Sequence, residues 1–83
     1  MRSEFIGDYE IEYAGMRLPE SENWGAFVAV YGPSHNPMHR NCVFSEQRVA
    51  LDSSFATEAE AEAEARKVAI LMVEKGHYQP GTT

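Results

Sequence analysis

Residues 57–76 read TEAEAEAEARKVAILMVEKG, and this stretch decides which fold the chain adopts. Its first half alternates Glu with Ala, which imitates the two-residue period of a strand, but both residue types favour helix over strand. Thr57 and Glu60 form a T-x-x-E capping box at its beginning, and Gly76 follows its last charged residue as a helix-ending glycine. The stretch therefore predicts a helix over about 58–75.

One side of this expected helix is apolar and carries small residues in its first half. The stripe consists of Ala61, Ala65, Val68, Ala69 and Met72, and Ile70, Leu71 and Val73 widen it toward the end. Because alanines occupy the first half, we expect the helix to approach a sheet closely there. Phe55, just before the cap, is expected to anchor its entry.

Strand-like segments precede the helix. In the first, apolar residues alternate with glutamates, which indicates a half-buried strand. The second is apolar on both faces, as is typical of a central strand. The third contains Ser45-Glu46-Gln47, where we expect a bulge or a second turn. The three expected strands span about 9–16, 24–31 and 41–51.

The order strand, strand, strand, helix predicts an α+β fold, in which a three-stranded antiparallel meander packs against one C-terminal helix. A chain of 83 residues is long enough for one domain, so residues 1–83 are expected to form it. We expect residues 1–8 and 77–83 to be loosely ordered, because neither stretch continues a periodic pattern.

Because the second expected strand is apolar on both faces and one helix covers only one face of the sheet, we expect some aromatic side chains on the uncovered face. Alternation divides the strand residues into two sets, and the sequence leaves open which face of the second strand the helix covers. One choice turns toward the helix the set Tyr9, Ile11, Val28, Val30, Val49 and Leu51. With that choice the open face carries Phe27, Tyr31, Phe44 and Arg48. An exposed aromatic patch usually marks a contact surface. The alternative is that residues 1–8 and the 32–40 loop cover these aromatics.

These features predict a small non-enzymatic interaction module. It is expected to bind another protein, or a second copy of itself, through the open sheet face or through an unpaired sheet edge. The alternative hypothesis is a nucleic-acid-binding module that uses the sheet face and a basic, His-containing region over about 35–48.

The charge balance opposes a nucleic-acid partner. Thirteen Asp and Glu stand against seven Lys and Arg, which gives a formal net charge of -6, whereas affinity for phosphates depends on basic side chains. Only residues 24–51 have a small positive balance, since two arginines there outnumber one glutamate. His35, His39 and Arg40 are the candidate anion-facing residues of the alternative hypothesis.

His35, His39 and Cys42 have metal-ligand residue types in an H-x3-H-x2-C spacing, with His77 as a conceivable fourth ligand. Structural zinc sites use paired, closely spaced ligands, and this chain has one cysteine, so we expect no metal. A Cys42–His39 dyad lacks a group to orient the histidine and an oxyanion donor. No phosphate-binding glycine motif is present. We therefore expect no catalytic residues and no cofactor.

The sequence also indicates in which cellular compartment the protein is expected. One cysteine cannot form an internal disulfide, which excludes a disulfide-stapled secreted scaffold. The longest apolar run, residues 68–73, is far shorter than a membrane span of about 18 residues, and residues 1–5 contain no apolar segment of signal-peptide length. We expect a cytoplasmic protein without membrane contact.

Three short motifs resemble those of small proteobacterial β-β-β-α proteins that have no assigned activity. They read FIGDYEI at 5–11, WGAFV at 24–28 and FATEAEA at 55–61. Because the resemblance extends over roughly residues 5–75, it implies the same order of strands and helix. It implies no chemistry.

A second set of residues resembles three-stranded DNA-reading domains of the ethylene-response-factor type and the arm-binding domains of phage integrases. The matching residues are Trp24, Ala26, Val28, Phe55, Thr57, Glu60 and Ala61. Those domains read DNA with Arg and Trp on the exposed sheet face, so the resemblance implies a nucleic-acid partner. This chain departs from them by placing Glu10 and Glu12 on that face.

Overall fold

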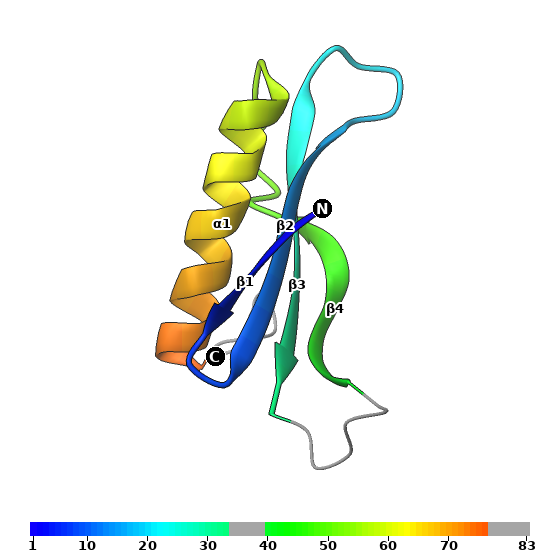
Figure 1. Ribbon diagram of the computed structural model, residues 1–83. Coiled ribbons are helices and arrows are strands. Elements are labelled where there is room, and N and C mark those ends of the chain that lie inside the picture. Colours follow the sequence, from blue (N-terminus) through cyan, green and yellow to red (C-terminus); the bar gives the residue numbers. More distant parts are fainter. Residues whose placement is uncertain (34–39, 77–83) are drawn as a thin grey trace.

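The structure has the expected α+β class of fold, in which an antiparallel sheet is followed by one C-terminal helix. The computed structural model describes residues 1–33 and 40–76, and within them four strands form one sheet in the order β1-β2-β3-β4 (Figure 1). The elements are β1 (Arg2–Ile6), β2 (Tyr9–Arg17), β3 (Trp24–Gly32), β4 (Asn41–Val49) and α1 (Glu58–Lys75). The expected number of three strands is therefore wrong, because β1 adds a fourth.

Strand β1 lies in the stretch 1–8 that the sequence pattern predicted to be loosely ordered. It pairs antiparallel with β2 in an unbroken register from Arg2 opposite Tyr13 to Ile6 opposite Tyr9. Gly7 has a φ of 60°, and a glycine with positive φ at the first position of a two-residue loop is typical of a type II′ hairpin. The tight turn returns the chain directly onto β2. The other predicted loose stretch, 77–83, lies outside the described residues.

Helix α1 confirms the expected bounds. The Thr57 side chain accepts a hydrogen bond from the backbone N–H of Glu60 at 3.2 Å, as an N-cap does. Gly76 ends the helix in the left-handed conformation, with a φ of 70°, and its N–H donates to the carbonyl of Met72. Local capping chemistry therefore decides both ends.

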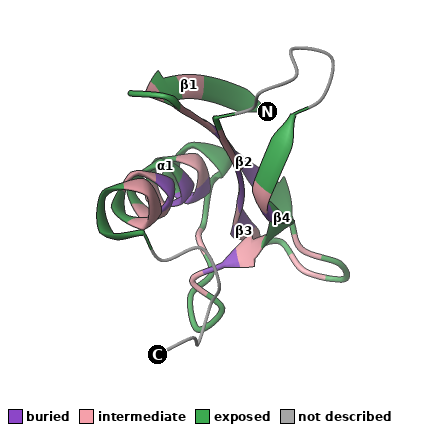
Figure 2. Ribbon diagram, turned by 90° about the horizontal axis from the view of Figure 1, so that it is seen from below, coloured by how far each residue is buried: buried purple, intermediate pink, exposed green. Residues whose placement is uncertain are grey.

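The core lies between α1 and strands β2 and β3. Ile11, Val28 and Val30 are the largest fully buried side chains, and buried residues gather where the helix faces these two strands (Figure 2). The helix contributes its alanine stripe, of which Ala61, Ala65 and Ala69 are completely buried. The expected close approach of the helix to the sheet is confirmed.

Gly15 shows how close this approach is. A Cβ atom at Gly15 would lie 2.5 Å from the carbonyl oxygen of Glu58 and 2.9 Å from the Cβ of Ala61. Both distances are below any tolerated contact, so a residue with a side chain would push the first turn of α1 away from β2. The pair Gly15 and Ala61 thus sets the distance between helix and sheet.

The predicted bulge in β4 is present, and it reverses one predicted side-chain orientation. Val28 faces Gln47 and Val30 faces Phe44, so three steps along β4 match two along β3. An extra residue turns the side chains beyond it to the other face. Phe44 is consequently 3% exposed in the core, and its expected place on the open face is wrong.

The end of β4 corrects a second orientation. Val49 is buried as expected, but Ala50 has a φ of 51° and ends the strand. Leu51, expected to face the helix, is 63% exposed in the following turn. Beyond this turn Phe55 exchanges two backbone hydrogen bonds with Trp24, at 2.8 and 2.9 Å, which leads the chain back to β3 before α1 begins.

Candidate interaction surface

The open face of the sheet carries the predicted aromatic residues Phe27 and Tyr31, which alternate with buried β3 residues that face the helix. Both are half-buried rather than exposed. The guanidinium of Arg40 stacks 3.5 Å from the centre of the Tyr31 ring. With Phe44 in the core, Phe27 and Tyr31 are the two predicted aromatic residues that stay on this face.

Arg40, just before β4, is engaged by two carboxylates of β2, the strand beyond β3. Its Nη2 donates to Glu10 Oε1 at 2.7 Å and to Glu12 Oε2 at 3.2 Å. Burial, followed by the nearby charge of Glu12, raises the pKa of the Tyr31 phenol. This arrangement leaves Arg40 with no positive charge in excess. The other predicted anion-facing residues, His35 and His39, lie outside the described residues.

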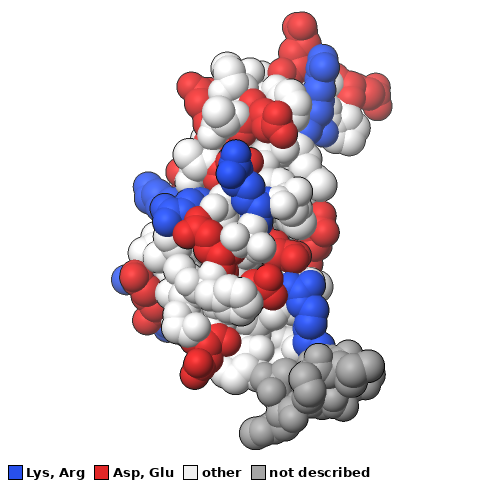
Figure 3. Space-filling view, in the orientation of Figure 1, with Lys and Arg blue, Asp and Glu red and all other residues white. Residues whose placement is uncertain are grey.

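Arg48 also lies on the open face, opposite Phe27. Its Nη2 donates to the carbonyl oxygen of Ser53 at 3.0 Å, and its Nε is enclosed without a hydrogen-bond partner among the residues that the structure describes. The guanidinium therefore ties β4 to the turn that follows it. Charges of both signs are interspersed on the side of the molecule shown in Figure 3.

The most exposed large apolar side chain among the described residues belongs to β1. Phe5 is 73% exposed, and Met1, just before the strand, is 56% exposed. Phe5 pairs with Glu10, so it lies on the open face of the sheet. Along its other side β1 has no neighbouring strand among the described residues, which leaves an edge with free backbone groups.

The opposite face of β1 is fastened to the helix by charge pairs. Glu4 accepts hydrogen bonds from Arg66 and from the hydroxyl of Tyr13. Arg2 forms an ion pair with Glu62, with 2.8 Å between Nε and Oε1. The bonds from Arg66 and from Tyr13 lower the pKa of Glu4 to about 2. These contacts hold the edge strand in one position.

The second edge, β4, is less suited to pairing. Its register with β3 is irregular at two places, and bulges of this kind discourage the addition of a strand. Its exposed residues are polar, small or charged, namely Asn41, Cys42, Ser45, Glu46 and Gln47. The regular edge of the sheet is therefore β1.

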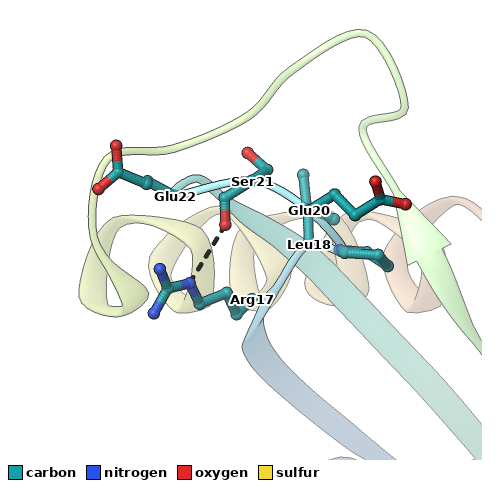
Figure 4. A pocket seen from close by; sticks show the side chains of 6 residues that line it. Arg17, Leu18, Glu20, Ser21 and Glu22 are labelled. Carbon is teal, nitrogen blue, oxygen red and sulfur yellow. Dashed lines mark hydrogen bonds between the residues drawn. The ribbon is translucent and has the colours of Figure 1, made fainter.

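A hollow of about 730 Å³ lies at the turn between β2 and β3 (Figure 4). Six consecutive residues, 17–22, line it, and Arg17 Nε donates to the Ser21 carbonyl oxygen at 3.2 Å. The side chains of Glu20 and Glu22 point away from that bond (Figure 4). The hollow thus brings together no groups from separate elements, and it carries no catalytic constellation.

Among residues 1–33 and 40–76 no group of three His, Cys, Asp or Glu side chains is placed to hold a metal ion. Cys42 is a free, exposed cysteine on β4. No helix within the described part of the chain is long and apolar enough to cross a membrane.

The sequence pattern missed β1 and its contacts because residues 2–6 lack apolar alternation. The signal that was available is the pair Gly7-Asp8, a two-residue hairpin signature between Phe5-Ile6 and Tyr9. The partners of Glu4 had no such signal, since Arg66 is 62 positions away.

Comparisons with protein-family models, with curated proteins and with solved structures found no match.

Proposed function

We propose that this chain is a non-enzymatic protein-interaction module whose contact surface is the edge strand β1. An extended segment of a partner adds to the sheet as a further strand beside β1, the recognition mode known as β-augmentation. Main-chain hydrogen bonds supply affinity, and Phe5 supplies an apolar contact on the open face.

The observation that carries the proposal is the combination of a regular, unpaired edge with an exposed phenylalanine. Natural sheets protect their edges with bulges, prolines or inward-pointing charges. Strand β1 contains no proline and keeps an unbroken register. Its two charged residues, Arg2 and Glu4, do point to the helix side, but they are paired there with Glu62 and Arg66 of the helix, so their charges are compensated within the chain. An edge held in place in this way is ready for an added strand.

Nucleic-acid binding has less support. Phosphate contacts require basic side chains that are free to bind, whereas Arg40 is paired with Glu10 and Glu12 and Arg48 is bonded to Ser53. The net charge of -6 adds a general repulsion.

The test is capture of binding proteins from a lysate by immobilised wild-type protein, Phe5→Lys and Leu51→Lys. Leu51 is the matched control, because it is an exposed apolar residue away from the β1 edge. We expect proteins retained by the wild type and Leu51→Lys to be lost from Phe5→Lys. An identical set of retained proteins on all three would show that β1 is not the contact surface. Circular dichroism confirms that each variant is folded.

A further inference from the structure

We propose that the strand that adds to β1 is the β1 strand of a second copy, so that two sheets join into one across a twofold axis at Ser3. This inference rests on the proposed function, because it names the partner of the same edge. It follows from the charges and apolar side chains along residues 1–5.

The register of such a pair is restricted by sheet geometry. In an antiparallel pair, two facing residues are of the same type, either both hydrogen-bonded or both non-hydrogen-bonded, and the two types alternate along a strand. A residue therefore cannot face its own sequence neighbour in a second copy. When a strand pairs with its own copy, one residue must face itself, and the twofold axis passes through that residue. The axis can therefore pass through Arg2, Ser3, Glu4 or Phe5. Each choice brings different side chains together.

The charges favour the axis at Ser3. In that register Arg2 of each copy faces Glu4 of the other, and both lie on the helix side of the sheet, because they pair with Tyr13 and Ile11 of β2. An axis at Glu4 or Arg2 would set like charges directly opposite each other, which is destabilising. The Arg2 side chain is 71% exposed, so it can reach a second carboxylate while it contacts Glu62.

The apolar side chains favour the same register. With Ser3 on the axis, Phe5 of each copy faces Met1 of the other on the open side of the sheet. These side chains are 73% and 56% exposed in the single chain. An axis at Phe5 would bring two phenylalanines together, but it would leave Met1 and both charge pairs without partners.

The strand is short, with five residues in β1, so the pair is expected to be weak and to depend on protein concentration. Sedimentation equilibrium over a range from about micromolar to about millimolar measures it. We expect a monomer–dimer equilibrium for the wild type and for Leu51→Lys. Phe5→Lys is expected to raise the dimer dissociation constant at least about tenfold.

A charge variant tests the cross-strand pairs. Arg2→Glu replaces attraction to Glu4 of the second copy with repulsion and should also weaken the dimer about tenfold or more. Arg17→Glu makes the same change in net charge at the far end of β2 and should leave the equilibrium unchanged. If both variants weakened the dimer equally, the effect would come from net charge, and the proposed pairing of Arg2 with Glu4 of the second copy would be wrong.

Disulfide trapping tests the register. In a Cys42→Ser background, Ser3→Cys places two thiols opposite each other on the axis, and oxidised glutathione should link the copies. Phe5→Cys in the same background should not be linked, because its two positions lie four residues apart along the pair, about 13 Å. A disulfide requires Cα atoms within about 7 Å. Linkage of Phe5→Cys without linkage of Ser3→Cys would overturn the axis at Ser3.

The outcomes separate this inference from the proposed function. If the wild type stays monomeric to about millimolar concentration while Phe5→Lys loses captured proteins, the second copy is wrong and the edge function stands. If the wild type dimerises and Phe5→Lys dimerises equally well, the copies do not meet at β1. If Phe5→Lys changes neither dimerisation nor capture, both proposals fail.

Discussion

Arg66 of α1 donates to both carboxylate oxygens of Glu4 in β1, with 2.5 Å from Nε to Oε2 and 3.1 Å from Nη2 to Oε1. Such a two-point contact between guanidinium and carboxylate is stronger and more directional than a single hydrogen bond. It joins the first strand to the helix across 62 positions of sequence. The orientation of the β1 edge therefore depends on this pair.

The first prediction concerns pH. The bonds from Arg66 and Tyr13 hold the folded-state pKa of Glu4 at about 2, against 4.5 for a free glutamate. A pKa lowered by folding contributes stability above the unfolded value, and this contribution is lost as the pH falls from about 4.5 to about 2. Carbon-13 NMR titration of the Glu4 carboxyl should give a midpoint well below those of exposed glutamates.

Glu4→Gln provides the control for this effect. The amide carries no charge, so the variant should be less stable than the wild type at about pH 7, and the difference should shrink at about pH 3. Urea unfolding at both pH values measures it. An unchanged difference at the two values would mean that the Glu4 charge contributes nothing to stability.

The second prediction concerns the spacing of helix and sheet. Gly15→Ala places a Cβ 2.5 Å from the Glu58 carbonyl oxygen, so α1 must move, and the expected loss is about 1–3 kcal/mol in the free energy of unfolding. Gly32→Ala is the matched control, because its nearest contacts are side-chain atoms at 3.3 Å or more. Equal losses in chemical denaturation would contradict the role of Gly15.

The third prediction separates two phenylalanines that alternation placed on one face. Phe44→Ala removes a core side chain and should cost about 3–5 kcal/mol of unfolding free energy. Phe27→Ala removes a half-buried side chain from the open face and should cost clearly less. Chemical denaturation of the two variants measures the difference. A larger loss for Phe27→Ala would mean that the β4 bulge does not turn Phe44 inward.

The fourth prediction concerns nucleic acid. Amide NMR spectra with a mixed DNA and RNA oligonucleotide pool at low salt should show no salt-sensitive shifts in residues 24–51, because Arg40 and Arg48 are engaged within the protein. Shifts that vanish in added salt and in Arg40→Glu would favour the nucleic-acid hypothesis instead. The Arg17→Glu variant, with the same change in net charge, serves as the control.

Much of the fold could be predicted because its signals are local. The capping residues Thr57 and Glu60 and the terminal Gly76 lie within a turn of the helix ends that they define. The alternation in β2 and the apolar pattern of β3 likewise depend on adjacent residues. Local patterns predict less of the candidate interaction surface. An unpaired sheet edge was anticipated, but the strand that provides it was not.

The orientation of Phe44 shows why local patterns fail there. A bulge among residues 45–47 was expected, yet the register against β3 determines which residue is the extra one, and with it the face of every residue beyond. In the same way, β1 has too little apolar alternation for its sequence to predict a strand. Pairing with β2 and the contacts of Arg2 and Glu4 with the helix stabilise it.

The sequence by itself determined the class of fold, the bounds of α1 and the acidic balance of the chain, because propensity, capping and charge are properties of neighbouring residues. Only the tertiary structure decided that β1 is a fastened edge strand with Phe5 exposed, and that Arg40 is neutralised by Glu10 and Glu12. The physical reason is that these contacts join residues about 30 to 62 positions apart. Their energies arise only after the sheet and helix have come together.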